Sequence, residues 1–220
     1  SVPLHLQPVF NDLGYKADDF PVTEKIAEDH PKNPINPYGQ SKLMVEIMLR
    51  DICFANDFNA TCLRYFNAAG YDPTGKIKGL EKEPGNLMPI VMEVVMGTRE
   101  KVVVFGDDYD TDDGTCIRDY IHVTDLAQAH VQALEHIASQ DEDLVLNLGT
   151  SNGISVLEIL EATKKLSGVD FKVEIGPRRA GDPAIVLADA SLAKDVLGWV
   201  PKHSNVETLV KSMLDTYRNQ

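Results

Sequence analysis

Cysteine is scarce in this sequence. Only Cys53, Cys62 and Cys116 occur among 220 residues, and none belongs to a Cys-x-x-Cys pair. This spacing excludes a disulfide framework and a cysteine-rich zinc site, so no metal is expected. A reducing compartment is the simpler expectation, and the cytoplasm is therefore the default location.

Long apolar runs are also missing, because no stretch approaches the roughly 20 residues that cross a bilayer. Basic residues are few as well: 21 Lys and Arg stand against 34 Asp and Glu, which gives a net charge of −13. Such a chain repels polyanions, so nucleic acid and anionic membranes are not expected partners. An anionic ligand would have to be bound locally, by a few well-placed arginines.

The rest of the sequence has a typical globular composition, with 43% hydrophobic and 25% charged residues. Residues 1–35 show no clear period, but helical and strand patterns alternate after them. Apolar spacing predicts helices at 38–54, 87–96 and 123–138, and strands at 60–66, 101–105, 144–148, 171–175 and 185–187. This alternation predicts an α/β fold.

Loops are expected at 67–70, at 71–85 and at 107–114. The last contains five Asp residues but no Glu, so a solvated loop is favoured over a calcium site. Two strings have the form of a capping box at the start of a helix, Ser155-x-x-Glu158 and Ser204-x-x-Glu207.

Tyr38 and Lys42 are the first candidate catalytic residues. They lie four positions apart at the start of a predicted helix, so both side chains point the same way. A tyrosine acts as a base near neutral pH only if its pKa falls by about 3 units, which corresponds to about 4 kcal/mol. A positive charge about 4 Å away supplies a similar energy at an effective dielectric constant of 20.

Several longer strings give this pair a context. The sequence around the pair reads Asn36-Pro-Tyr-Gly-Gln-Ser-Lys42, with a glutamate four residues later. It is followed by Leu63-Arg-Tyr-Phe-Asn-Ala-Ala-Gly70, Asn86-Leu-Met-Pro89, Val104-Phe-Gly-Asp-Asp-Tyr109, Asp113-Gly-Thr-Cys-Ile-Arg-Asp-Tyr-Ile-His122, Asn147-Leu-Gly-Thr-Ser-Asn-Gly153 and Pro177-Arg-Arg-Ala-Gly-Asp182.

From about Phe20 to its end, the sequence resembles the UDP-glucose 4-epimerase family, within the extended short-chain dehydrogenases/reductases of the NAD-dependent epimerase/dehydratase type. The resemblance implies an isomerase that interconverts UDP-glucose and UDP-galactose by NAD-mediated hydride transfer at sugar C4, through a 4-keto intermediate. It implies NAD as cofactor, a UDP-sugar as substrate and, for full-length relatives, a homodimer.

The resemblance also implies roles for individual residues. Tyr38 would take the proton of the sugar 4-hydroxyl, while Lys42 would hold the nicotinamide ribose and lower the tyrosine pKa. Phe66 would lie beside the nicotinamide. The remaining positions would contact the UDP-sugar: Asn67, Asn86 and Leu87 the sugar and diphosphate, Val103 and Phe105 the uracil, Arg118 and Arg179 the diphosphate, and Asp182 the ribose. Asp119 and His122 are expected to be structural.

Three features depart from the family pattern. The glycine-rich turn that binds the NAD pyrophosphate is absent, and Gly149-Thr-Ser-Asn-Gly153 does not replace it. The catalytic serine or threonine expected before the tyrosine helix has no counterpart in residues 1–15. Val186 stands where a larger residue often limits the space for a 2-acetamido group, so N-acetylhexosamine substrates are sterically allowed.

The expected architecture is the C-terminal remainder of a doubly wound, Rossmann-like NAD domain followed by a smaller α/β substrate domain. Residues 1–79 would belong to the first, with 1–19 atypical, and residues 80–220 mainly to the second, with some segments returning. Two alternatives stay open: another sugar-nucleotide short-chain dehydrogenase, such as a 4,6-dehydratase or a decarboxylase, and a fragment without catalytic activity.

Overall fold

The computed structural model describes residues 23–26, 32, 34, 37–140, 142–179 and 181–220. The atypical stretch expected at 1–19, and Asn36 of the first motif, lie outside the described residues. Strand β1 (Thr23–Ile26) falls in the region for which the sequence predicted no regular element. Among the described residues, no helix combines the length and the apolar character needed to cross a membrane.

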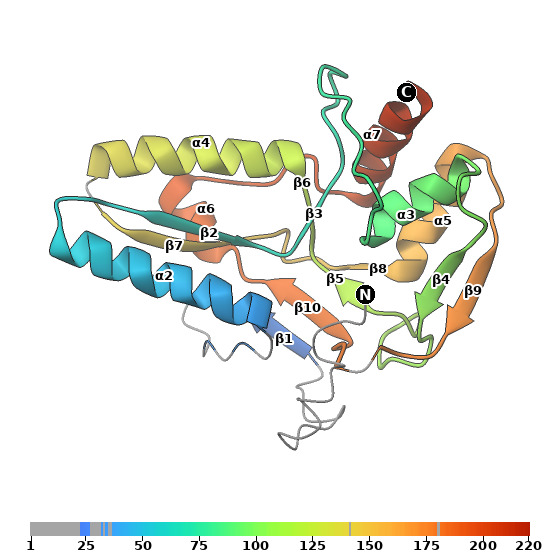
Figure 1. Ribbon diagram of the computed structural model, residues 1–220, viewed down its shortest axis with the longest axis horizontal. Helices are drawn as coiled ribbons and strands as arrows, with labels where there is room; N and C mark the ends of the chain where they lie inside the picture. Colours follow the sequence, from blue (N-terminus) through green and yellow to red (C-terminus); the bar gives the residue numbers. More distant parts are fainter. Residues whose placement is uncertain (1–22, 27–31, 33, 35–36, 141, 180) are drawn as a thin grey trace.

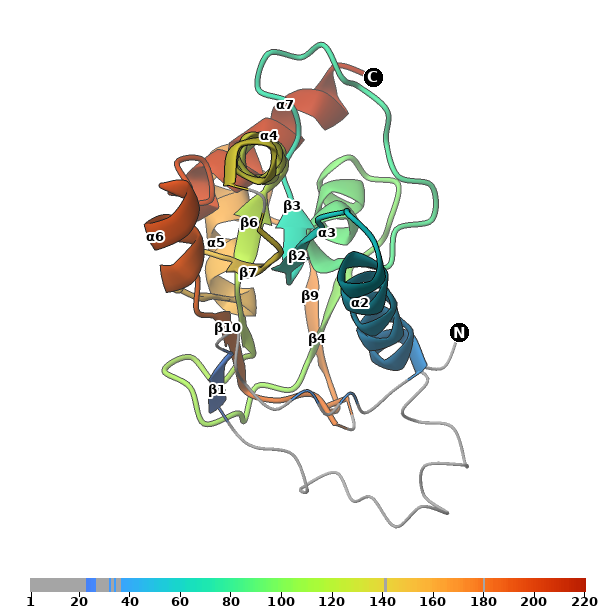
Figure 2. The ribbon, with the colours of Figure 1, turned by 90° about the vertical axis from the view of Figure 1, so that its left-hand side faces the viewer.

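One half of the molecule is built on a pair of parallel strands, β2 (Thr61–Tyr65) and β7 (Leu144–Leu148). Helices α2 (Pro37–Ala55) and α4 (Val123–Gln140) lie on opposite sides of this pair (Figures 1 and 2). A third helix, α6 (Ser191–Leu197), packs on β7. The core of this half joins the apolar residues of β7 and α4 to Trp199, which is buried.

The other half is mainly helical. Helices α3 (Leu87–Val95), α5 (Val156–Ser167) and α7 (Val206–Arg218) pack against one another. They share a core with β4 (Val102–Phe105), which pairs in parallel with β9 (Val173–Gly176). Figure 1 shows this helical group to the right of the layered half.

Short strands connect the two halves. β10 (Ile185–Ala188) lies between β1 and β5 (Ile117–Arg118), and β5 also pairs with β8 (Ile154–Ser155), in the order β1-β10-β5-β8. In addition, β3 (Asn67–Ala69) pairs in parallel with β6 (Tyr120–His122). These connections bring segments distant in sequence to one place, the region between the halves.

Most of the predicted helices and strands are observed within a few residues of their predicted limits, but two expectations were wrong. Residues 67–70 were expected to be a loop, whereas 67–69 form β3, because the ladder with β6 satisfies their backbone groups. Ser204 was expected to cap α7. Instead Asn205 is the N-cap, and its side chain accepts from the Thr208 N–H at 2.9 Å.

The Ser204 hydroxyl is used elsewhere, in a buried network around Asp125. It donates to Asp125 Oδ2 at 2.6 Å, and the backbone N–H groups of Lys202 and His203 donate to the same carboxylate at 3.1 and 2.8 Å. A buried carboxylate without hydrogen-bond donors costs more free energy than the loss of one helix cap. The Ser204 hydroxyl therefore binds Asp125 and does not cap α7. The capping box at Ser155 and Glu158 is present as predicted.

His122 forms a second buried network, which ties β6 to α7. Its Nδ1 accepts from the Thr124 N–H at 3.1 Å, so the ring proton lies on Nε2, which faces Ser212 Oγ at 3.1 Å. Gly70 packs against this ring with φ +81°, and a Cβ there would lie 2.4 Å from His122 Cδ2. Burial lowers the pKa of His122; Asp125 opposes this effect and His203 adds to it.

Gly70→Ala is expected to destabilise the chain by about 2–4 kcal/mol, because it adds both backbone strain and a clash with a packed ring. Gly75→Ala is the matched control: it has φ +67° but open space around the added Cβ, so a loss of about 1 kcal/mol is expected. Chemical unfolding of the two variants measures the difference. Equal losses would contradict the packing argument.

The stability of the chain should fall as the pH drops below the ordinary histidine pKa of 6.5. The unfolded chain then binds a proton that folded His122 resists, and at pH 5.5 this difference reaches at most about 1.4 kcal/mol. Comparing urea unfolding of the wild type with that of His122→Gln at pH 7.5 and 5.5 isolates the effect. The variant should lose less stability over this range, and an identical loss would count against the role of His122.

Candidate functional site

A cleft of about 460 Å³ opens between the two halves, and several separate segments line it. One wall is the segment that runs from the end of β2 through β3. The start of α3 forms a second wall, and β4 forms a third. Its remaining lining includes Cys116, Arg118, Tyr120, Arg179 and Asp182. Polar and apolar groups both line the cleft, as a ligand with a ring and a charged group requires.

Two arginines bring positive charge to this cleft. Arg118 is mostly buried; one of its terminal nitrogens donates to Ile117 O at 2.9 Å, and the other lies 3.5 Å from Asp182 Oδ1. The guanidinium carbon of Arg179 lies 4.0 Å from the centroid of the Phe105 ring. The two cations therefore flank the cleft, one fixed by backbone carbonyls and a carboxylate, the other stacked on an aromatic ring.

The N-terminus of α3 adds a further positive feature. Asn86 is its N-cap residue with extended backbone, and its side chain makes no capping hydrogen bond. Both Asn86 and Leu87 line the cleft, and backbone N–H groups in the first turn of a helix favour an anion. Asn67 lines the cleft as well and donates its side-chain amide to Asp119 O at 3.1 Å.

Asp119 lies between the cleft residues Arg118 and Tyr120, and its hydrogen bonds fix the position of this segment. Its buried carboxylate accepts from the N–H groups of Thr150, Ser151 and Ala188 at 2.8, 3.1 and 3.2 Å. Burial raises the pKa of Asp119, while these donors oppose the rise. The side chain is thus used for structure, as the sequence predicted, between the cleft residues Arg118 and Tyr120.

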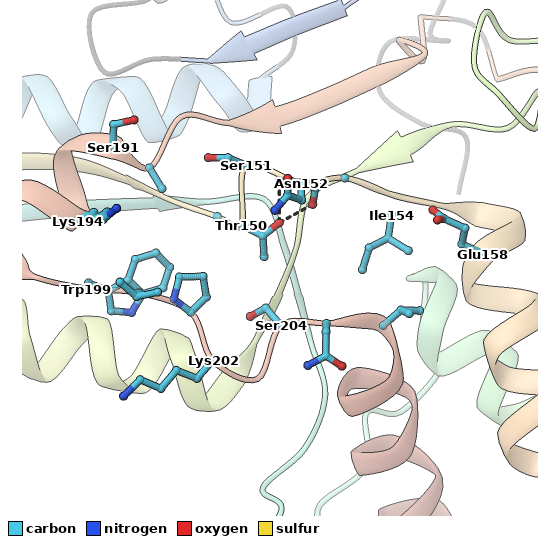
Figure 3. A pocket seen from close by; sticks show the side chains of 17 residues that line it. Thr150, Ser151, Asn152, Ile154, Glu158, Ser191, Lys194, Trp199, Lys202 and Ser204 are labelled. Carbon is cyan, nitrogen blue, oxygen red and sulfur yellow. Dashed lines mark hydrogen bonds between the residues drawn. The ribbon is translucent and has the colours of Figure 1, made fainter.

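A second hollow, of about 530 Å³, lies where the loop 149–153 meets the start of α6 and the segment that leads into α7 (Figure 3). Within the loop, the Thr150 hydroxyl accepts from the Asn152 N–H at 3.1 Å. Lys194 and Lys202 are among its lining residues. The sequence analysis concluded that this loop does not replace the glycine-rich turn of a dinucleotide site. Its Thr150 and Ser151 N–H groups donate to the Asp119 carboxylate.

Tyr38 and Lys42 lie together on the first turns of α2. The Lys42 ammonium is 5.3 Å from the centroid of the Tyr38 ring, as their four-residue spacing predicted. Tyr38 is accessible to solvent, with 67% of its surface exposed. Neither residue lines the cleft. Their helix buries no side chain, and its apolar residues Met44, Ile47 and Met48 are exposed.

The structure brings nine of the twelve predicted site residues together on one cleft: Phe66, Asn67, Asn86, Leu87, Val103, Phe105, Arg118, Arg179 and Asp182. Tyr38, Lys42 and Val186 do not line it, although Val186 pairs with Arg118 across β10 and β5.

Sequence reasoning missed Cys116 and Tyr120, which also line the cleft. The alternation of Cys116, Arg118 and Tyr120 could have revealed them, because alternate residues of an extended strand face one side. Burial raises the pKa of Tyr120 to about 12, so its phenol stays protonated.

Comparisons with known proteins agree with the motifs. Residues 14–149 match the model of the NAD dependent epimerase/dehydratase family. The chain is 47% identical over 191 residues to a UDP-glucose 4-epimerase of Halalkalibacterium halodurans, covering 87% of this chain and 57% of that relative.

Two solved structures are similar in fold and sequence. A UDP-glucose 4-epimerase of Stenotrophomonas maltophila with bound NAD and formylated UDP-arabinopyranose superposes with a TM-score of 0.84 at 42% identity, covering 88% of this chain and 58% of that one. A UDP-Glc/GlcNAc 4-epimerase of Campylobacter jejuni gives a TM-score of 0.74 at 47% identity, with coverages of 89% and 60%.

The chain spans about three fifths of the length of these relatives. The predicted α/β class with a doubly wound, Rossmann-like part is confirmed by the structural similarity. The match over residues 14–149 covers more than half of the chain, and the relatives match most of it. This chain therefore belongs to the NAD dependent epimerase/dehydratase family.

Proposed function

We propose that this chain carries the UDP-sugar site and the tyrosine–lysine pair of a UDP-glucose 4-epimerase, which interconverts UDP-glucose and UDP-galactose through a 4-keto intermediate. One observation carries the proposal: nine residues that the motifs assign to ligand contact, taken from distant segments, line a single cleft. Their convergence is what a binding site requires, whereas scattered surface residues would have no reason to meet. The relatives support the same activity.

In this proposal the diphosphate lies between Arg118, Arg179 and the start of α3. With a net charge of −13, the chain as a whole repels an anion, so the local cations have to supply the attraction. Guanidinium groups suit this task because their planar array of donors matches phosphate oxygens. The uracil would pack along Val103 and Phe105, and Asp182 would accept from the ribose hydroxyls.

Tyr38 and Lys42 supply the proton chemistry. Tyr38 takes the proton from the sugar 4-hydroxyl, and Lys42, one helical turn away with its ammonium 5.3 Å from the centroid of the Tyr38 ring, supplies the neighbouring positive charge. NAD, when bound, supplies the acceptor for the C4 hydride. Tyr38, Lys42 and Phe66 would contact it, and the exposure of Tyr38 leaves room for such a partner.

We further propose a cytoplasmic location, no nucleic-acid partner and, for full-length relatives, a homodimer. The domain division stays a proposal: residues 1–79 in the NAD domain and 80–220 mainly in the substrate domain, with some segments returning to the first. We keep the prediction that the small side chain of Val186 sterically allows N-acetylhexosamine substrates, although Val186 does not line the cleft. A UDP-Glc/GlcNAc epimerase among the relatives supports it.

The nucleotide site is tested by calorimetric titration of the 220-residue chain with UDP. Arg179→Ala should weaken binding about tenfold or more, since a charge-assisted hydrogen bond contributes about 1.5–3 kcal/mol. Arg99→Ala is the control, because Arg99 is paired with Glu93 at the surface, away from the cleft. Equal affinities for wild type and Arg179→Ala, or no UDP binding at all, would refute the assignment.

The catalytic pair needs a dinucleotide-binding segment, so we expect no epimerase turnover from these 220 residues alone. The Halalkalibacterium halodurans relative with its matching segment replaced by residues 37–220 provides one. In that chimera, Tyr38→Phe should lower kcat by at least about 100-fold, as expected when a general base is lost. Tyr71→Phe, outside the cleft, should leave kcat unchanged. An active Tyr38→Phe variant would remove Tyr38 from the mechanism.

A further inference from the structure

Arg178 lies next to a proposed ligand residue but does not line the cleft itself. It follows the parallel ladder of β4 and β9, whose last pair is Phe105 with Gly176. One more backbone hydrogen bond, from Gly106 N–H to Gly176 O at 2.9 Å, closes the ladder. Beyond this point the segments that follow the two strands diverge: the one after β4 enters the acidic loop 107–114, and the one after β9 leads to Arg179.

The Arg178 side chain links these two diverging segments. Its Nε donates to Asp108 Oδ1 at 2.6 Å, and a terminal nitrogen donates to Asp108 O. Its guanidinium carbon also lies 4.3 Å from the centroid of the Tyr109 ring. We call Asp108, Tyr109 and Arg178 the clasp. One arginine thus makes two hydrogen bonds and one stacking contact across the exit of the ladder.

The clasp is packed closely against the backbone. Gly106 has φ +92°, and a Cβ there would lie 2.6 Å from Arg178 Cγ and 2.8 Å from Tyr109 Cε2. Tyr109 is buried and shares a small apolar cluster with Cys116 and Ala184. Because Cys116 lines the cleft, the clasp is continuous with the cleft floor through Tyr109.

The neighbouring residue, Arg179, faces the cleft. Its guanidinium stacks on Phe105, the last residue of the strand to which the clasp is tied. The contacts of Arg178 with the acidic loop therefore act on the backbone that carries Arg179. The two adjacent arginines therefore have different partners and different tasks.

We infer that Arg178 is a positioning residue: its clasp with Asp108 and Tyr109 holds Arg179 over Phe105, ready for the diphosphate of a uridine nucleotide. This inference rests on the proposed function for the identity of the ligand. Stability alone does not explain the clasp, because its ion pair is exposed, with side-chain exposures of 45% and 70%, and exposed pairs contribute little. What the clasp changes is the freedom of Arg179, and an arginine ordered before binding loses less entropy when the ligand arrives.

Two measurements on the 220-residue chain test the inference. The first is calorimetric affinity for UDP, in which Arg178→Ala should weaken binding roughly tenfold, through loss of a preorganised charge-assisted contact. The second needs no ligand: because the Arg179 guanidinium lies 4.0 Å from the centroid of the Phe105 ring, we expect the ring current to move the NMR signals of the Arg179 side chain upfield. This upfield shift should disappear in Arg178→Ala. Asp108→Ala, which attacks the clasp from its other side, should reproduce both changes.

A double-mutant cycle separates positioning from direct contact. If Arg178 acts through Arg179, then Arg178→Ala should have no further effect on UDP affinity in an Arg179→Ala background. Arg178→Lys keeps a charge opposite Asp108 but loses the planar fork, so it should restore part of the affinity. Thermal unfolding confirms that each variant is folded, and Arg99→Ala again serves as the control.

The outcomes are distinguishable. Loss of both the upfield shift and the affinity supports the inference. Retention of both in Arg178→Ala overturns the inference, and the proposed function stands if Arg179→Ala still weakens UDP binding about tenfold or more. If the wild type does not bind UDP but Arg178→Ala abolishes the upfield shift, the proposed function fails and the positioning of Arg179 is upheld. Additive losses in the double variant would show that Arg178 contacts the ligand itself, which also overturns the inference.

Discussion

The arrangement of the cleft depends on the hydrogen bonds that the carboxylate of Asp119 accepts. This carboxylate is buried between the two halves, and it collects N–H groups from the loop after β7 and from the end of β10. Its backbone is used as well: Asp119 N–H donates to Val186 O, and Asp119 O accepts from Asn67 N–H. One residue thereby joins four segments that are distant in the sequence. Gly149 is required beside it, since a Cβ there would lie 2.5 Å from Oδ2.

The position of Asp119 explains why the cleft is well defined although its walls are short strands. Arg118 and Tyr120, its immediate neighbours, point to the cleft side, while its own side chain points away. A strand of two or three residues has little stability by itself. The buried hydrogen bonds of Asp119 on one side therefore fix the cleft residues Arg118 and Tyr120 on the other.

The sequence predicted the long elements well because their patterns are local. Helix α2, strand β7 and the capping box of α5 each follow from the spacing of residues within one element. It did not predict β3 as a strand, because three residues carry no measurable period and their pairing depends on β6, about 50 residues away. The Ser204 cap failed for a related reason: the local rule competes with a buried carboxylate, Asp125, that only the tertiary structure brings near.

For the candidate site, the motifs identified nine residues that meet on the cleft, but they missed Cys116 and Tyr120 and did not reveal the supporting contacts around the cleft. The resemblance assigned Arg179 to the ligand and gave Arg178 no role, whereas the structure shows that Arg178 stacks on Tyr109 and Arg179 on Phe105. Which of two adjacent arginines faces a cleft depends on where the strand ladder ends, and that follows from the pairing of β4 with β9.

The order β1-β10-β5-β8 has a consequence for how the molecule is made. Strand β10 separates two elements that leave the ribosome long before it does, and Arg118 gains its neighbour Val186 only when β10 is inserted. A nascent polypeptide that ends before residue 185 lacks β10, so its Arg118 lacks the neighbour Val186. Synthesis from N- to C-terminus therefore leaves β5, at the cleft, without its neighbouring parallel strand until β10 has emerged.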